Sequence, residues 1–394
     1  MARVIIHLDL DAFFCAVEEL RDPSLRGRAF AVGGSPEGRG VVASCSYAAR
    51  EYGIHSAMPM AQAVRRCPNL IVVQSNFKSY GHYSRQVMER LHALTPLLEK
   101  LSIDEAFMDV TGIRAEPEAI ARKLQKQIND ELNLPCSLGV ASNKLVAKIA
   151  NNVGKAQARG GTTPKAITII APGTEADFLA PLPVRELWGV GPKTADKLRM
   201  MGIETIGDIA GWPPADMIRR FGKHGADIHR RAQGIDNRPV ETEHESKSIS
   251  KETTFNRDSN NRDELLQTLR RLADGVGRQL RKEGLAGTTV KLKLRWPDFT
   301  TITRQATLPH PVSTDDEIYA AAADIFATAW PHRQHVRLIG VGVSGLDTAQ
   351  RQLSLWDAQS EQQEQQLQET LDDLRDRFGE GTITRGSHFR SNRR

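Results

Sequence analysis

The stretch HLDLDAFF, residues 7–14, decides the fold because it ends an apolar strand on two acidic side chains. The run that leads into it, Val4 to Leu8, has the length and the β-branched residues of a strand. Successive side chains alternate between the faces of a strand, so Asp9 and Asp11 project to one side and Leu10 to the other. Carboxylates at the end of a buried strand are costly unless a cation compensates them. We therefore expect a positive charge beside this strand end.

A second acidic pair, Asp104 and Glu105, lies in KLSIDEAFMDVT, residues 100–111, a segment typical of a hairpin or a strand edge. Mg²⁺ prefers carboxylate and carbonyl oxygens. Three carboxylates and one main-chain carbonyl from two neighbouring strands can hold two metal ions about 4 Å apart. The alternative is that these acids cap the sheet or pair with lysines.

The remaining elements alternate between strands and helices. In the N-terminal half, strands are expected at 29–34, 40–46 and 136–141, and helices at 13–20, 47–52, 59–66, 80–94, 116–132 and 143–153. This order predicts an α/β or α+β sheet with helices on one face. Two short helices hinged at residues 189–191 and a further short helix follow, and residues 246–346 then have the order β-α-β-β-α-β. A Gln/Glu-rich segment at 361–378 is expected to be a helix or partly disordered.

The composition limits the class of protein. The chain has 394 residues, 40% of them hydrophobic, which is enough for two to four domains. It has no apolar run of about 18 residues and no signal-peptide pattern, and its four cysteines form no CxxC pair. We expect a reduced, cytoplasmic protein without zinc or disulfides.

The charge is unevenly distributed, although the net charge is only +5. Residues 247–304 hold 13 Lys and Arg against 7 Asp and Glu, whereas residues 357–377 hold 7 acidic residues against 2 Arg. A basic segment before an acidic tail predicts a surface that binds a polyanion. A solvated charged face explains the same counts.

Four segments, in this order, resemble the motifs of the Y-family of DNA polymerases and, within it, of the bacterial translesion branch. They are HLDLDAFFCAVEE (7–19), SYAAREYGIHSAMPMAQA (46–63), SIDEAFMDVT (102–111) and GVASNKLVAKIA (139–150). The resemblance covers roughly residues 3–346, and it rests on the several motifs in order rather than on any one of them.

The resemblance implies an α+β multidomain fold shaped like a right hand. The expected domains are a palm at 1–12 and 75–168, small fingers at 13–74, a thumb with a helix-hairpin-helix at 169–235, a linker at 236–245, a β-α-β-β-α-β little finger at 246–346 and a tail at 347–394. It also implies a monomeric, template-directed polymerase of low fidelity that adds dNTPs to a primer 3′-OH in translesion synthesis. The sequence shows no second acidic cluster for a proofreading nuclease.

The resemblance assigns roles to the acidic residues and to the aromatic pair behind them. Asp9, Asp104 and Glu105, with the carbonyl of Leu10, would hold two Mg²⁺ ions per active site. Phe14 would be the steric gate, an aromatic plate that leaves no room for a 2′-hydroxyl. Phe13 would help to form the floor under the nucleotide. The alternative is that the Phe-Phe pair simply starts a core helix.

A further set of side chains would bind the triphosphate. Tyr47 and Arg50 would share one face of a helix, and guanidinium and phenol groups suit phosphate oxygens. Ser44 stands where the family often has Thr, and Lys155 matches a lysine that reaches the β- and γ-phosphates. The usual Lys-Pro-Asn-Gly is here Lys-Ala-Gln-Ala. The small residues Ala43 and Ala57 would form a loose roof over the nascent base pair.

Two regions are expected to contact the DNA backbone. LWGVGPKTADKL, residues 187–198, resembles a helix-hairpin-helix, with Gly189, Gly191 and Lys193 nearest a phosphate. The alternative is a tight corner between two helices, in which the glycines serve only close packing. In KLKLRW, residues 291–296, Lys291, Lys293 and Arg295 alternate with apolar residues, which predicts a sheet with one basic face on duplex phosphates.

The segment QLSLW resembles the short peptide that binds the β sliding clamp, with Trp in place of Phe. Its expected contact residues are Gln352, Leu353, Leu355 and Trp356. Two rival functions fit parts of the sequence. A nucleotidyl cyclase has a similar two-metal sheet but needs no downstream DNA-binding modules, and a non-catalytic DNA-binding scaffold needs no intact carboxylates.

Overall fold

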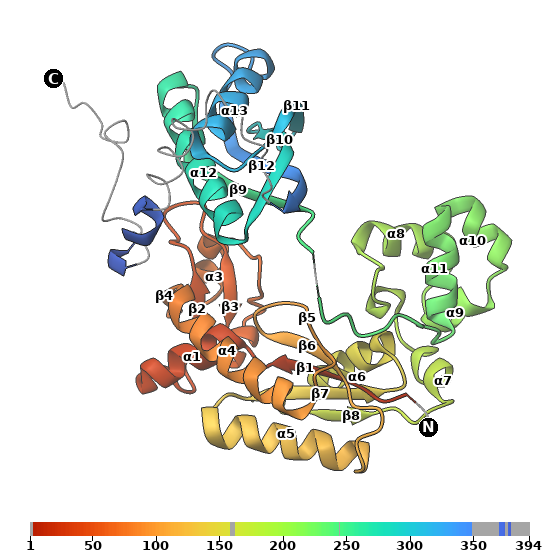
Figure 1. The fold of residues 1–394 in the computed structure, drawn as a ribbon. Helices are drawn as coiled ribbons and strands as arrows, with labels where there is room; N and C mark the ends of the chain where they lie inside the picture. Colours follow the sequence, from red (N-terminus) through yellow and green to blue (C-terminus); the bar gives the residue numbers. More distant parts are fainter. Residues whose placement is uncertain (1–2, 158–161, 244, 349–369, 375–376, 380–394) are drawn as a thin grey trace. The chain divides into compact units, whose positions relative to one another are not determined.

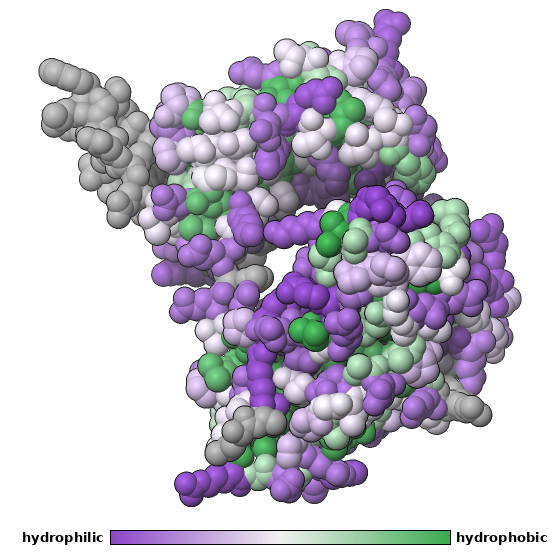
Figure 2. All heavy atoms as spheres, turned by 90° about the vertical axis from the view of Figure 1, so that its right-hand side faces the viewer, coloured by the Kyte–Doolittle hydropathy of each residue, from purple (hydrophilic) through white to green (hydrophobic). Residues whose placement is uncertain are grey.

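The structure, a computed structural model, describes residues 3–157, 162–243, 245–348, 370–374 and 377–379. The chain divides into two compact units, Met1–His244 and Glu245–Arg394, whose elements are drawn in Figure 1. In the part of the chain that is described, no helix is long and apolar enough to cross a membrane. On the face drawn in Figure 2, hydrophobic side chains are scattered among hydrophilic ones.

The first unit is built on a five-stranded sheet whose middle strand is β1. The strand order is β5-β6-β1-β7-β8, with β1 at Ile5–Leu10, β5 at Leu98–Lys100, β6 at Glu105–Asp109, β7 at Cys136–Ala141 and β8 at Ile167–Ile169. β1 pairs antiparallel with both β6 and β7. The segment that ends on the two aspartates is therefore the centre of the sheet.

Helices cover both faces of this sheet, so the expectation of helices on one face was wrong. Ile6 and Leu8 of β1 face a core shared with α4 (Phe77–Leu94) and α5 (Pro117–Leu132). Ile5, on the opposite face, shares a core with α6 (Lys144–Ala156). The reason is that β1 is apolar on both sides, and each apolar face needs a cover.

A smaller sheet follows β1 along the chain. Its order is β3-β2-β4, with β2 at Phe30–Gly33, β3 at Val42–Cys45 and β4 at Ile71–Gln74. Its helices are α1 (Phe13–Arg21), α2 (Tyr47–Arg50) and α3 (Met60–Arg66), with a 3-10 turn at Pro23–Leu25. The predicted hairpin between β2 and β3 is confirmed, whereas β4, parallel to β2, was not predicted.

A helical segment ends the first unit. It contains α7 (Glu175–Leu179), α8 (Pro192–Met200), α9 (Ile206–Gly211), α10 (Pro214–Phe221) and α11 (Lys223–Ala232). The residues before the GVG hinge form only a 3-10 turn, Val184–Glu186, instead of the predicted helix. Pro181 and Pro183 each lack a backbone donor just upstream, which disfavours a longer helix. The hinge is thus followed, but not directly preceded, by an α-helix.

The second unit has the predicted order β-α-β-β-α-β, which is confirmed. Its elements are β9 (Ser248–Ser259), α12 (Arg262–Lys282), β10 (Leu285–Arg295), β11 (Thr301–Val312), α13 (Asp315–Ala329) and β12 (Val336–Thr348), in a sheet of order β11-β10-β12-β9. Of the predicted tail helix, residues 370–374 are helical. Asp372 forms an ion pair at 2.9 Å with Arg281 of α12. The candidate clamp segment, residues 352–356, lies outside the described residues.

Candidate active site

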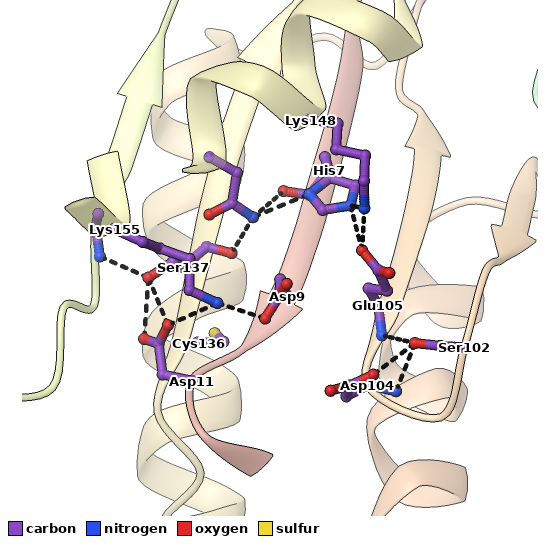
Figure 3. Close-up of polar contacts among 12 residues, drawn as sticks. His7, Asp9, Asp11, Ser102, Asp104, Glu105, Cys136, Ser137, Lys148 and Lys155 are labelled. Carbon is purple, nitrogen blue, oxygen red and sulfur yellow. Dashed lines mark hydrogen bonds and ion pairs between the residues drawn. The ribbon is translucent and has the colours of Figure 1, made fainter. Parts of the chain in front are cut away.

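The two acidic groups predicted from the sequence meet at one end of the central sheet. Asp9 is the cross-strand partner of Glu105, and the Leu10 amide donates to the Asp104 carbonyl at 3.0 Å. Asp104 lies in the turn between β5 and β6, immediately before β6 begins. Figure 3 shows Asp9 on β1, with Glu105 on β6 and Asp104 in the turn before it. Residues almost a hundred positions apart in the sequence therefore share one sheet end.

The cation expected beside β1 is an ammonium group in this structure. Lys155 of α6 donates to Asp9 Oδ1 at 2.5 Å and lies 3.2 Å from Asp11 Oδ1 (Figure 3). Burial lowers the pKa of Lys155, but the two carboxylates outweigh it and the net pKa is raised. Asp11 is buried, accepts from Ser137 Oγ and from the Lys165 amide, and has a pKa raised mainly by burial. As predicted, Asp9 and Asp11 reach the same cation.

Glu105 has a different set of partners. Its Oε2 atom lies 3.1 Å from His7 Nε2 and also accepts from Lys148 Nζ (Figure 3). Burial favours the neutral acid, but the His7 hydrogen bond and the Lys148 ammonium hold the pKa of Glu105 down to about 2. The Glu105 carboxylate is therefore ionised throughout the physiological range.

Asp104 is the least compensated of the three acids. Its Oδ1 accepts from Ser102 Oγ at 2.5 Å. Burial raises the pKa of Asp104; the Ser102 hydrogen bond opposes this, and the neighbouring Asp9 and Glu105 charges add to it. Like charges gathered in a partly buried site are the arrangement that a divalent cation stabilises.

The donor set fits a hard divalent cation. In the described part of the chain, each of the three acids keeps one carboxylate oxygen without a hydrogen bond, since the contacts use only Oδ1 of Asp9, Oδ1 of Asp104 and Oε2 of Glu105. The described residues nevertheless contain no group of three His, Cys, Asp or Glu side chains already gathered as a metal site. Asp9 and Glu105 each pair with a lysine in this structure, as the alternative interpretation predicts. Oxygen-only donors with adjacent uncompensated charge still suit Mg²⁺.

The two phenylalanines differ sharply in exposure. The chain turns through Ala12, which has φ 46°, and α1 begins at Phe13. Phe13 is only 2% exposed and belongs to the core, as the alternative interpretation holds. Phe14 is partly exposed, and its ring stacks on Tyr80 at 4.2 Å between centroids and 10° between planes. Phe14 is therefore the ring available to a ligand.

Tyr80, which backs Phe14, was not among the predicted site residues. Its hydroxyl donates to the buried Glu18 carboxylate at 2.6 Å, which fixes the ring. Phe77 lies one turn earlier on α4 and contacts both rings edge-on, at 5.9 Å from Phe14 and 5.8 Å from Tyr80. The i, i+3 aromatic pair at the start of α4 was the available sequence signal.

The predicted triphosphate residues fall into two groups. Tyr47 and Arg50 lie together on α2, with the guanidinium 4.4 Å from the phenol ring. Burial and the nearby Asp11 charge raise the pKa of Tyr47 to about 12, and its buried hydroxyl has no hydrogen-bond partner among the described residues. Ser44 is only 9% exposed and accepts from Cys15 Sγ at 3.6 Å, so its hydroxyl is directed into the core.

The roof residues are on the surface. Ala43 and Ala57 are both exposed, and the Ala57 amide donates to the Val42 carbonyl at 2.8 Å. This bond joins the segment of Ala57 to the strand that carries Ala43.

The candidate DNA-backbone residues of the hinge are exposed. Gly189 has φ +104°, a conformation that favours glycine. Gly191 is the N-cap of α8, and Lys193 lies exposed in its first turn. The N-terminus of this nine-residue helix is suited to an anion.

In the second unit, β10 alternates as predicted. Leu292, Leu294 and Trp296 are buried, while Lys291, Lys293 and Arg295 are partly exposed on the other face. Lys293 pairs with Glu252 of β9 at 2.7 Å. Lys291 and Arg295 form no ion pair with a described residue, and Arg295 donates to Thr301 Oγ1.

The comparisons with known proteins agree with one another. The impB/mucB/samB family matches residues 8–152, its C-terminal domain matches residues 246–355, and the IMS family HHH motif matches residues 172–203. The chain is 38% identical to "DNA polymerase IV" of Dehalococcoides mccartyi, over 98% of both chains. It is 41% identical to "DNA polymerase IV" of Halorhodospira halophila, over 90% of this chain and 99% of that one.

Solved structures give the same result. A Y-family DNA polymerase chimera built from Dbh and a short Dpo4 segment superposes with a TM-score of 0.76 at 25% identity, over 86% of this chain and 98% of that one. An insertion ternary complex of Dbh DNA polymerase superposes with a TM-score of 0.62 at 25% identity, over 87% and 98%.

Proposed function

The chain belongs to the impB/mucB/samB family and, within it, to the DNA polymerase IV group of Y-family translesion polymerases, and on this premise we propose that it extends a primer by two-metal nucleotidyl transfer. It is a DNA-directed DNA polymerase with the α+β multidomain Y-family fold, it acts on DNA and dNTPs, and it depends on a metal. The cross-strand pairing of Asp9 with Glu105, beside Asp104, carries the proposal for the site.

Two Mg²⁺ ions, when bound, would polarise the primer 3′-hydroxyl and neutralise the charge that develops on the phosphates. Asp9, Asp104 and Glu105 would hold them through their unbonded oxygens, together with the Leu10 carbonyl. Lys155, which lies against Asp9 in this structure, would then turn its ammonium group to the triphosphate.

Tyr47 and Arg50 would bind the same triphosphate from α2, because the Tyr47 hydroxyl is without a partner in the described structure and Arg50 is exposed. Ser44 and Phe13 support this site from the core rather than by direct contact, given their burial. A Lys155→Ala variant that kept the wild-type KM for dNTP would show that Lys155 does not bind the triphosphate.

The experiment that tests the proposed function is primer extension on a primer–template with Mg²⁺ and single dNTPs. Addition only of the dNTP complementary to the template is expected. A cyclase would instead release a cyclic nucleotide from a free triphosphate, and a scaffold would bind DNA without extending it. Either result would overturn the proposal.

We propose the palm, fingers, thumb and little finger with the boundaries given from the sequence. Support comes from the separate sheets in the first unit and from the division of the chain near residue 244. Low fidelity is part of the proposal, because Ala43 and Ala57 offer little surface against a base pair. Cytoplasmic location and a monomeric state stay predictions.

The β10 basic face is proposed to bind duplex phosphates, since its lysine and arginine side chains project away from the buried leucines. Lys291→Ala is expected to weaken binding to all duplex sequences and to lower the slope of log affinity against log salt by about 0.9, the value for one phosphate contact. Fluorescence anisotropy between low and moderate salt measures both.

Lys251 offers a matched control for Lys291. It lies on the face of the same sheet that is covered by α12. Its Cδ atom packs against Gly275 of that helix, 2.7 Å from the position that a Cβ on Gly275 would take. Lys251→Ala should leave the salt slope unchanged. Equal slopes for the wild type and Lys291→Ala would exclude this lysine as a phosphate contact.

We also propose that residues 352–356 bind the sliding clamp, on the strength of the sequence QLSLW alone. A Gln head and apolar anchors suit a pocketed groove. Co-elution of the full chain with a bacterial clamp in gel filtration, lost on Leu355→Ala with Trp356→Ala, is expected. Co-elution that survives both changes would place the contact elsewhere.

A further inference from the structure

His7 lies in the middle of β1 and is completely buried. Its ring lies 4.8 Å from the Phe107 ring, measured between centroids. A phenylalanine at this position could therefore fill the same space. A buried polar ring is costly unless its nitrogens are hydrogen-bonded. Both nitrogens of His7 have partners: Asn151 Nδ2 lies 3.0 Å from Nδ1, while Nε2 lies 3.1 Å from Glu105 Oε2 and 3.4 Å from Lys148 Nζ.

The partners of Asn151 fix the tautomer of His7. Asn151 Nδ2 lies 3.0 Å from the Ser137 carbonyl and 3.4 Å from the His7 carbonyl, and only the amide nitrogen can face carbonyl oxygens. It must therefore be the donor to His7 Nδ1. In the neutral ring, the proton is then on Nε2, which donates to Glu105.

The hydrogen bond leaves part of Glu105 available. His7 and Lys148 both use Oε2, so Oε1 remains for another ligand. The Lys148 side chain is long and flexible. His7, by contrast, lies on a strand and is hydrogen-bonded to Asn151, and the His7 and Asn151 side chains are fully buried. Of the two partners of Oε2, His7 is therefore the more rigidly held.

We propose that His7, with its tautomer fixed by Asn151, is a positioning residue that presents Glu105 Oε1 to a divalent cation. The inference rests on the proposed function, because it takes Glu105 as a ligand of Mg²⁺. His7 touches neither substrate nor metal and acts only through Glu105. Partners that orient a metal ligand commonly change metal affinity by 10–100-fold when they are removed.

The first test uses NMR on the metal-free full chain with ¹⁵N-labelled histidine, the His7 signals being identified from a His7→Gln variant. A protonated Nε2 and an unprotonated Nδ1 are expected. Asn151→Ala should weaken this preference, whereas Asn152→Ala, the exposed neighbour, should not. A protonated Nδ1 in the wild type would overturn the inference whatever the enzyme does.

The second test measures the Mg²⁺ concentration for half-maximal primer extension. His7→Phe removes the donor but keeps the ring, and about a tenfold increase is expected. His7→Gln keeps an amide donor for Glu105 and should restore most of the wild-type value. Equal Mg²⁺ dependence in His7→Phe and the wild type would refute the positioning role.

Two controls separate the possible failures. Thermal unfolding shows whether His7→Phe is folded, and Asn151→Ala against Asn152→Ala gives the same comparison of Mg²⁺ dependence without changing the ring. A wild-type chain that shows the expected tautomer but extends no primer at any Mg²⁺ concentration would overturn the proposed function and, with it, the role toward Mg²⁺. The wrong tautomer in an active polymerase would overturn this inference alone.

Discussion

Replacing Asp104 by Asn is expected to reduce primer extension at least about a thousandfold while leaving the fold and DNA binding intact. Neutralising charge in phosphoryl transfer is worth several kcal/mol, and each 1.36 kcal/mol is a factor of ten in rate. Asn keeps the volume and can still accept from Ser102, but it offers a cation no charge. Primer extension with Mg²⁺ under single-turnover conditions measures the loss.

The same substitution should not lower stability. A carboxyl whose pKa is raised in the folded state, as at Asp104, destabilises the fold in its ionised form above the unfolded-state pKa. Asn removes that charge and the repulsion from Asp9 and Glu105, so the Tm at pH 7 should equal or exceed that of the wild type. Asp130→Asn, exposed on α5, is the control and should change neither rate nor Tm. Undiminished extension by Asp104→Asn would remove this residue from the catalytic set.

The sequence was sufficient to predict which acids converge. Alternation along β1 placed Asp9 and Asp11 on one side, and both do reach the Lys155 ammonium. The pairing of Asp9 with Glu105 required the register of β1 and β6, which no local pattern specifies. The preference of Mg²⁺ for carboxylate oxygens suggested one shared site for these acids, and the resemblance to known polymerases then assigned each of them its role.

The lysines that neutralise the acids were harder to assign. Lys155 was predicted only as a triphosphate ligand, and Lys148 was not singled out. Lys148, Asn151 and Lys155 are spaced three and four residues apart on α6, so they share the helix face toward β1. That spacing was readable, but nothing in the sequence said that β1 would be the neighbour of this face.

The short elements show a similar limit. β4, β5 and β8 have only three or four residues each, and such runs lack enough periodicity to be distinguished from loops. β5 and β8 pair with the longer strands β6 and β7, whereas β4 pairs with β2, which is equally short. The long, strongly periodic elements were correct in type, since amphipathic patterning over many residues decides between strand and helix.

The second large effect is expected at Phe14. Its ring is held against Tyr80 and is partly exposed, so it is suited to exclude a 2′-hydroxyl. Phe14→Ala should admit ribonucleotides and reduce the preference for dNTP over rNTP by about a hundredfold, within the 1–3 kcal/mol that a pocket contact supplies. Ratios of kcat/KM for a matched dNTP and rNTP pair measure the change.

Phe77→Ala separates the gate from the aromatic cluster that supports it. Phe77 contacts both Phe14 and Tyr80 but is 65% exposed, so its removal takes two edge-on contacts from the cluster and leaves the Phe14–Tyr80 stack in place. Sugar selectivity should therefore stay near the wild-type value in Phe77→Ala. If both variants lost selectivity equally, the cluster as a whole would set the pocket, and if neither did, the sugar would be checked by another group. A loss confined to Phe14→Ala is the result that a gate made of this single ring predicts.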